Sequence, residues 1–191
     1  MRPTRASALV LSFTALVVTG CGSGMSATRF TNPGFDFGFV ERVAVVPFEN
    51  LTDDRQAAAR ATRLVITELL SSGAIDVVEP GEVQAALDKM GSRITTPSTE
   101  QVVALGQSLG VQGVIIGAVA QSETLRTGTV AVPVVTLDLH LLETETGVAV
   151  WAATHTEKGG GLGSKLFGVP GEPMSETTRK AVRRLVTTLV Q

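Results

Sequence analysis

The most constraining feature of this sequence is its N-terminal segment, which ends at the only cysteine of the chain, Cys21. Arg2 and Arg5 precede an apolar run at positions 6–18, and small residues follow it. A basic start, a short apolar run and small residues before a cleavage point are typical of a secretory signal peptide. The run has about 13 residues, whereas a membrane-spanning helix needs about 20. The sequence therefore predicts that residues 1–20 are removed during export.

The four residues at this boundary, Val18-Thr19-Gly20-Cys21, resemble a bacterial lipobox. The resemblance implies cleavage between Gly20 and Cys21, a diacylglycerol on the cysteine sulfur and an acyl chain such as palmitate on the new amine. Several acyl chains give stable anchoring, because each buried CH2 contributes about 0.8 kcal/mol. The alternative is an ordinary secreted protein, but a lone thiol is unusual in an oxidising compartment. Gly22, where inner-membrane lipoproteins commonly carry aspartate, favours the outer membrane with the domain facing the periplasm.

The rest of the chain has the length of one domain. Residues 21–33 are mostly small and polar and predict a flexible tether that carries the lipidated cysteine, and residues 34–191 are expected to form a single domain. Without the two arginines of the signal peptide, 14 basic residues face 18 acidic ones. This mild negative charge argues against nucleic acid as a partner. A single cysteine excludes a disulfide framework and a thiolate metal cluster.

Hydrophobic periodicity and turn residues predict the element order β-α-β-α-α-β-β-β-α, an α/β (α+β) domain with helices packed on a mixed sheet of about five strands. Strands are expected at 42–48, 75–78, 111–121, 130–142 and 148–157. Helices are expected at 55–71, 80–90, 99–109 and 172–190. Ser98 and Gln101 match a capping box, and Gly73 and Gly110 are expected to end two helices. Residues 122–129 are expected to form a polar turn.

No stretch of the sequence matches a catalytic or metal-binding motif, so we expect a protein that is not an enzyme and needs no cofactor. The loop at 159–165 contains Ser164 and Lys165 but lacks the glycine before lysine and the following helix that a phosphate-binding loop requires. His140 and His155 lie on paired strands, but the register counted from the turn places them about 10–13 Å apart, too far to share a metal ion. Both histidines are expected at the surface.

Two groups of residues are candidates for binding a partner. Phe35, Phe37 and Phe39 alternate with small or polar residues, which places them on one face if the segment is extended. That face either seals the edge of the core, which is favoured, or forms a partner-binding patch near the membrane. Four basic residues cluster on one face of the last helix: Arg179, Lys180, Arg183 and Arg184. They form either a solvated face, which is the default, or a docking surface for an acidic partner or an anionic envelope polymer.

Three stretches of the sequence together resemble the CsgG-type lipoproteins of the outer membrane, namely residues 42–50, 109–117 and 139–151. The first is similar to their opening strand, the second to a helix-to-strand segment and the third to a hairpin. The same periplasmic domain occurs in the penicillin-binding-protein activator LpoB and in the N-terminal domain of TolB-like proteins. The resemblance covers residues 40–157 and implies an anticodon-binding/TolB N-terminal-like fold. It identifies the fold better than the function, because it rests on sequence pattern and not on catalytic residues.

CsgG itself forms a ring-shaped secretion channel by inserting two long hairpins into the membrane, and each hairpin needs about 20 residues. The corresponding segments here, residues 122–129 and 158–171, are too short. The leading hypothesis is therefore a non-enzymatic lipoprotein that binds other envelope proteins, alone or as a homo-oligomer, in assembly or secretion of surface material. The alternative is an LpoB-like activator of a cell-wall synthesis enzyme. It ranks second because a tether over residues 22–32 reaches at most about 36 Å. A hydrolase with unrecognised residues is a minor third.

Overall fold

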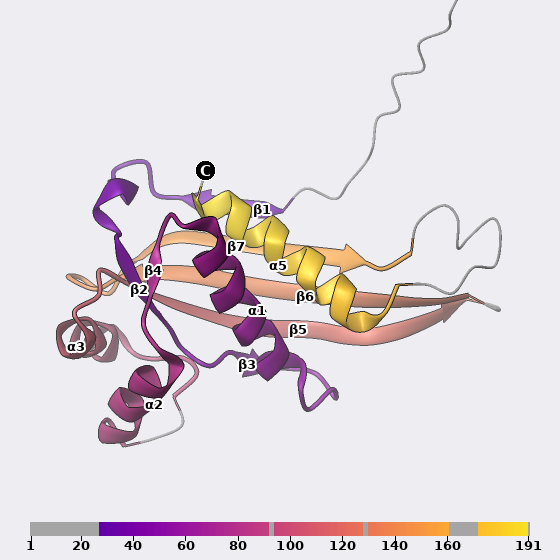
Figure 1. Ribbon diagram of the computed structural model, residues 1–191, viewed down its shortest axis with the longest axis horizontal. Helices are drawn as coiled ribbons and strands as arrows, with labels where there is room; N and C mark the ends of the chain where they lie inside the picture. The colour runs from indigo at the N-terminus through magenta and orange to yellow at the C-terminus, as the bar shows by residue number, and fades with distance from the viewer. Residues whose placement is uncertain (1–26, 92–93, 128–129, 161–171, 191) are drawn as a thin grey trace, which may run out of the picture.

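The computed structural model describes residues 27–91, 94–127, 130–160 and 172–190. Within them, seven strands form one sheet with the order β1-β7-β6-β5-β2-β4, and β3 pairs with β5 (Figure 1). The strands are β1 (Thr28–Thr31), β2 (Arg42–Val45), β3 (Glu49–Asn50), β4 (Asp76–Val77), β5 (Gly113–Thr127), β6 (Val130–Glu143) and β7 (Ala149–Lys158). β5, β6 and β7 pair antiparallel in sequence order, whereas β2 pairs parallel with β4 and β5. The predicted mixed α+β fold is confirmed, with more strands than expected.

Helices cover both faces of this sheet. They are the 3-10 helix η1 (Phe37–Phe39) and the α-helices α1 (Ala57–Ser72), α2 (Pro80–Lys89), α3 (Thr99–Leu109) and α5 (Met174–Val190). α1 and α5 lie side by side across one face of the sheet (Figure 1). α2 and α3 pack on the opposite face, over the part of the sheet that contains β2 and the start of β5.

The two faces carry separate hydrophobic clusters, as the two-residue period of a strand requires. On β2, Val43 and Val45 belong to the cluster with α1 and α5, whereas Ala44 belongs to the cluster with α2 and α3. Strand β2 is therefore apolar on both sides, as its sequence predicts for a strand inside a sheet. Trp151 on β7, 1% exposed, lies in the cluster under α1 and α5.

Capping residues lie at the helix termini where the sequence predicts them, both at the start of α3 and at the ends of α1 and α3. The Ser98 hydroxyl accepts a hydrogen bond from the Gln101 N–H at 3.4 Å, and the Gln101 side chain accepts one from the Ser98 N–H at 2.8 Å. The capping box is thus confirmed at the start of α3. Gly73 and Gly110 follow α1 and α3 with φ angles of 65° and 63°, a left-handed conformation that glycine adopts without a Cβ clash.

Two segments that were expected outside the sheet belong to it. Residues 28–31, within the predicted tether, form β1 and pair antiparallel with residues 151–154 of β7. Residues 122–127, expected as part of a turn, continue β5 opposite residues 130–135 of β6. Polar composition was misleading in both cases, because strands at a sheet edge can expose polar side chains while their backbones remain paired.

Candidate functional site

The predicted cleavage and lipidation residues, Gly20 and Cys21, lie outside the residues that the structure describes. The position of β1 nevertheless limits how far the domain can lie from Cys21. Strand β1 begins at Thr28, and the intervening residues 22–27 span at most about 22 Å when fully extended. A lipid on Cys21 would therefore hold β1 close to the membrane surface. In the described part of the chain, no helix has both the length and the hydropathy needed to cross a bilayer.

The three phenylalanines do not share one extended face, so that expectation is wrong. Residues 37–39 form η1 because the Asp36 carboxylate accepts a hydrogen bond from the Gly38 N–H at 2.9 Å and turns the chain. Phe35 and Phe37 meet edge to face, with ring centroids 5.0 Å apart, and pack against the core. Phe39 remains 50% exposed. Two of the three rings thus seal the edge of the core, and binding of a partner by Phe39 stays a prediction.

The four basic residues predicted on one face of α5 are each paired with a carboxylate. The ion pairs are Arg179 with Glu176, Lys180 with Glu172, Arg183 with Glu68, and Arg184 with Glu157. Two of the carboxylates come from α1 and β7, which the sequence could not place beside α5. The pairs neutralise much of the positive charge on this face, so it resembles a solvated, ion-paired helix surface. A docking role for these four residues stays a prediction.

The histidines lie in the register that the sequence predicts, since His140 pairs with Ala152 and not with His155. His155 is 3% exposed, so its expected surface position is wrong: its side chain is buried on β7. Its Nε2 atom lies 3.0 Å from Glu157 Oε2, and the same oxygen forms an ion pair with Arg184 Nε at 3.0 Å. Within the described ranges, no group of three His, Cys, Asp or Glu side chains is placed to hold a metal ion.

A groove of about 710 Å³ lies between the first halves of α1 and α5. Its lining includes Arg60, Arg63 and Leu64 of α1 and Ser175, Glu176 and Arg179 of α5. Arg179 and Glu176 form two hydrogen bonds, at 2.9 Å through Nε and 2.5 Å through Nη2. Arg63 is exposed and forms no ion pair with a carboxylate of the described residues. The groove therefore carries more positive than negative charge.

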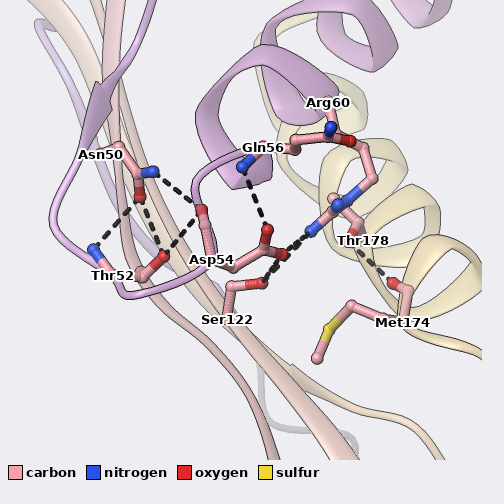
Figure 2. Close-up of polar contacts among 8 residues, drawn as sticks. All are labelled: Asn50, Thr52, Asp54, Gln56, Arg60, Ser122, Met174 and Thr178. Atoms are coloured by element: carbon pink, nitrogen blue, oxygen red, sulfur yellow. Dashed lines mark hydrogen bonds and ion pairs between the residues drawn. The ribbon is translucent and has the colours of Figure 1, made fainter.

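A polar network that includes Asp54 and Ser122 holds Arg60, a lining residue of the groove, in place (Figure 2). Its Nη2 atom donates to Asp54 Oδ2 at 2.6 Å, and the Ser122 hydroxyl donates to the same oxygen at 3.2 Å. The other carboxylate oxygen of Asp54 accepts from the Gln56 N–H at 3.1 Å. The hydrogen bond from Arg60 lowers the pKa of Asp54 against the opposing effect of desolvation, and Gln56 and Ser122 lower it further. The network joins the loop before α1 to strand β5 and orients Arg60.

Sequence reasoning did not find this groove. The three-residue spacing of Arg60 and Arg63 places both on one side of a helix, which is the one local signal that was available. Arg179 joins them only because α1 and α5 pack side by side, and no pattern within either helix reports that contact. The clustering of basic residues was instead read from α5 alone, where the charges are largely neutralised.

Solved structures of other proteins share this fold, among them those of PelC and of lipoprotein GNA1162. A PelC dodecamer from Paraburkholderia phytofirmans has a TM-score of 0.58 and 20% identity over 86% of this chain and 96% of that chain. A second PelC dodecamer structure has a TM-score of 0.60 over 87% of this chain and 99% of that chain. Lipoprotein GNA1162 from Neisseria meningitidis has a TM-score of 0.56 and 16% identity over 77% of this chain and 99% of that chain. The chain is therefore a mixed α+β domain of the class that includes PelC and GNA1162.

A family model identifies the chain more closely. Residues 22–156, more than two thirds of the chain, match the model described as peptidoglycan-synthase activator LpoB. The chain belongs to the LpoB family. The match begins directly after Cys21 and covers β1 through most of β7, while α5 lies beyond it. It supports the LpoB relationship named from the sequence, and it does not support the CsgG-type assignment that was named first. Among curated proteins, none matches the sequence.

Proposed function

We propose that this protein is a non-enzymatic periplasmic lipoprotein that binds a peptidoglycan synthase and stimulates it. The observation that carries the proposal is the match of residues 22–156 to the family of peptidoglycan-synthase activators. The matched segment includes the helices α1 to α3 and nearly the whole sheet, so it is a match to the domain and not to a short motif. Activation in this account comes from protein contact, and no side chain is assigned a chemical step.

The lipobox-like sequence at Cys21 supports an anchor in the outer membrane, with the domain on the periplasmic side. The structure shortens the tether that was expected from the sequence, because residues 28–31 are part of the sheet. With at most about 22 Å between the lipid and β1, the domain stays near its membrane. A synthase anchored in the opposite membrane would therefore have to extend across the periplasm to meet the activator.

The proposal is tested by measuring the mass of the complex. The mature chain, lipidated at Cys21, is mixed in detergent with a bifunctional peptidoglycan synthase from the same organism and analysed by light scattering on a sizing column. We expect one species whose protein mass equals the sum of the two partners. Two separate species at protein concentrations of about 10 µM, which is on the order of the Kd of a weak regulatory complex, would contradict the proposal. The variant Cys21→Ser has no lipid and so cannot enter the same detergent micelle as the synthase. It therefore controls for association that occurs only through detergent.

A second candidate is assembly of surface material by a homo-oligomer of this chain. The observation that favours it is the likeness to PelC, which was solved as a dodecamer and is covered almost completely by this chain. The same light-scattering measurement on the protein alone tests it. A discrete species of many chains would support this candidate, whereas a monomer across the accessible concentration range would contradict it.

A further inference from the structure

We infer that the groove between α1 and α5 binds a peptide segment of the partner protein that carries carboxylate side chains. This inference rests on the proposed function, because it names the surface through which the activator would contact its partner. The groove is defined by Arg60, Arg63 and Leu64 on α1 and by Ser175, Glu176 and Arg179 on α5.

The charge of the groove favours an acidic ligand. Three arginines and one glutamate line it, in a protein whose mature chain is acidic overall. Arg63 has no carboxylate partner among the described residues. Arg60 uses only Nη2 for its hydrogen bonds to Asp54 and Ser122, and its Nη1 atom makes no hydrogen bond within the described part of the chain. A guanidinium has five N–H donors in a planar fork, so donors remain for a carboxylate.

The arginines differ in how well they are held, and this divides their roles. Asp54 fixes Arg60 and Glu176 fixes Arg179, so two guanidinium groups are positioned before a ligand arrives. Binding to pre-positioned groups costs less side-chain entropy than binding to mobile ones. Arg63 is exposed and has no carboxylate partner among the residues that the structure describes, so a bound ligand would supply one. We therefore expect the affinity for the ligand to depend more on the charge of Arg63 than on that of Arg60 or Arg179.

The backbone adds positive potential at the same end of the groove. Arg60 and Glu68 of α1 lie near Arg179 and Arg183 of α5 respectively, so the two helices run parallel. Both N-termini consequently lie at one end, beside Ser175, as Figure 1 shows for the helices. A helix N-terminus carries a partial positive charge, and two of them together strengthen the attraction for an anion. The arginines remain the principal determinant.

The size and mixed lining favour a peptide over a small anion or an anionic surface. A volume of about 710 Å³ is much larger than a single phosphate or carboxylate requires. Leu64 provides apolar contact, and Glu176 places one carboxylate in the lining, which disfavours a uniformly anionic membrane or polymer. A peptide with alternating acidic and apolar side chains satisfies both features.

A fluorescein-labelled dodecapeptide of alternating glutamate and leucine is a direct probe, with a lysine–leucine peptide and phosphatidylglycerol vesicles as competing ligands. For the mature chain carrying Cys21→Ser, which has no lipid of its own to insert into vesicles and needs no detergent, we expect saturable binding of the acidic peptide that weakens with added salt. Arg63→Glu is expected to weaken binding at least tenfold, on the order of one lost charge-assisted contact, and Arg63→Ala less. Arg29→Glu, the same charge change at an exposed position on β1, is the matched control and is expected to leave binding within about twofold.

Three outcomes would overturn the inference: equal binding by Arg63→Glu, equal binding of the lysine peptide, or binding to vesicles in place of the peptide. Both substituted positions are exposed, so the variants are expected to keep the wild-type unfolding midpoint. Stimulation of the synthase separates this inference from the proposed function. If wild type and Arg63→Glu stimulate the synthase equally, the groove assignment fails while the function stands. If the peptide binds through Arg63 but the synthase is not stimulated, the function fails while the groove stands.

Discussion

Arg183 Nε on α5 lies 3.1 Å from Glu68 Oε1 on α1, and this ion pair joins two helices whose residues are 115 positions apart in sequence. It lies beyond the groove, farther along both helices than Arg60 and Arg179. The Arg183 side chain is 57% exposed, so solvent screens the pair. Helix packing here depends mainly on the apolar residues beneath it, such as Leu185, which is fully buried.

Replacing Arg183 and replacing Leu185 should therefore have very different effects on stability. We expect Arg183→Ala to lower the free energy of unfolding by less than about 1 kcal/mol. Leu185→Ala should lower it by about 3 kcal/mol, because it removes a buried side chain and leaves a cavity. Urea unfolding followed by circular dichroism measures both. Comparable losses for the two variants would show that the ion pairs, and not the core, hold α5 on the sheet.

The Asp54–Arg60 contact predicts a pH dependence. The pKa of Asp54 is lowered in the folded state, so its ionised form stabilises the fold above the unfolded-state pKa of about 4. That contribution is lost as the pH falls below 4 through the folded-state pKa. We expect Asp54→Asn to cost about 1–2 kcal/mol at pH 7 and progressively less as the pH is lowered toward 3.

Urea midpoints of Asp54→Asn and wild type, measured from pH 7 to pH 3, check this expectation. Asp53→Asn is the matched control, because Asp53 is the exposed neighbour of Asp54 and forms no ion pair within the described residues. A difference between Asp54→Asn and wild type that stays constant over the whole range would rule out ionisation of Asp54 as its cause.

Gly106 on α3 marks a close approach between this helix and the turn that joins β6 to β7. A Cβ atom at Gly106 would lie 2.3 Å from Thr144 Cβ. Thr144 cannot readily move, because its hydroxyl donates to the Val111 carbonyl at 2.7 Å and is buried. We expect Gly106→Ala to destabilise the protein by about 1–3 kcal/mol.

Gly81 on α2 provides the matched control for Gly106. A Cβ atom there would meet nothing within 4 Å, so Gly81→Ala should be neutral or stabilising by a few tenths of a kcal/mol up to about 1 kcal/mol. Thermal unfolding of the two variants measures the contrast. Equal midpoints would mean that α3 shifts freely away from the turn.

The lipobox-like segment predicts that membrane association depends on Cys21. Cys21→Ser should abolish incorporation of labelled palmitate and release the mature protein from the membrane fraction, because the acyl chains on this residue are its expected anchor. Ser23→Ala, a change of similar size two positions later, should leave both unchanged. Retention of Cys21→Ser in washed membranes would show that something other than the lipid anchors the chain.

The features predicted correctly from the sequence are those that depend on residues close together in the chain. The capping box of Ser98 and Gln101 and the left-handed stop at Gly110 are local, so pattern alone located both ends of α3. Strand β1 was missed because its pairing with β7 joins residues far apart in sequence, and because residues 21–33 around it are mostly small and polar, as is typical of a tether. The buried position of His155 and the groove around Arg63 also depend on where α5 lies. Such contacts have no signal within one element.

Activation of the synthase by this protein is measured directly by the initial rate of glycan polymerisation by a bifunctional peptidoglycan synthase. The mature chain is added in increasing amounts to the synthase of the same organism with its lipid-linked precursor. We predict a rate that rises and saturates with the amount of the chain, and no polymerisation by the chain without the synthase. A rate that stays flat across the titration, with both proteins folded, would contradict it.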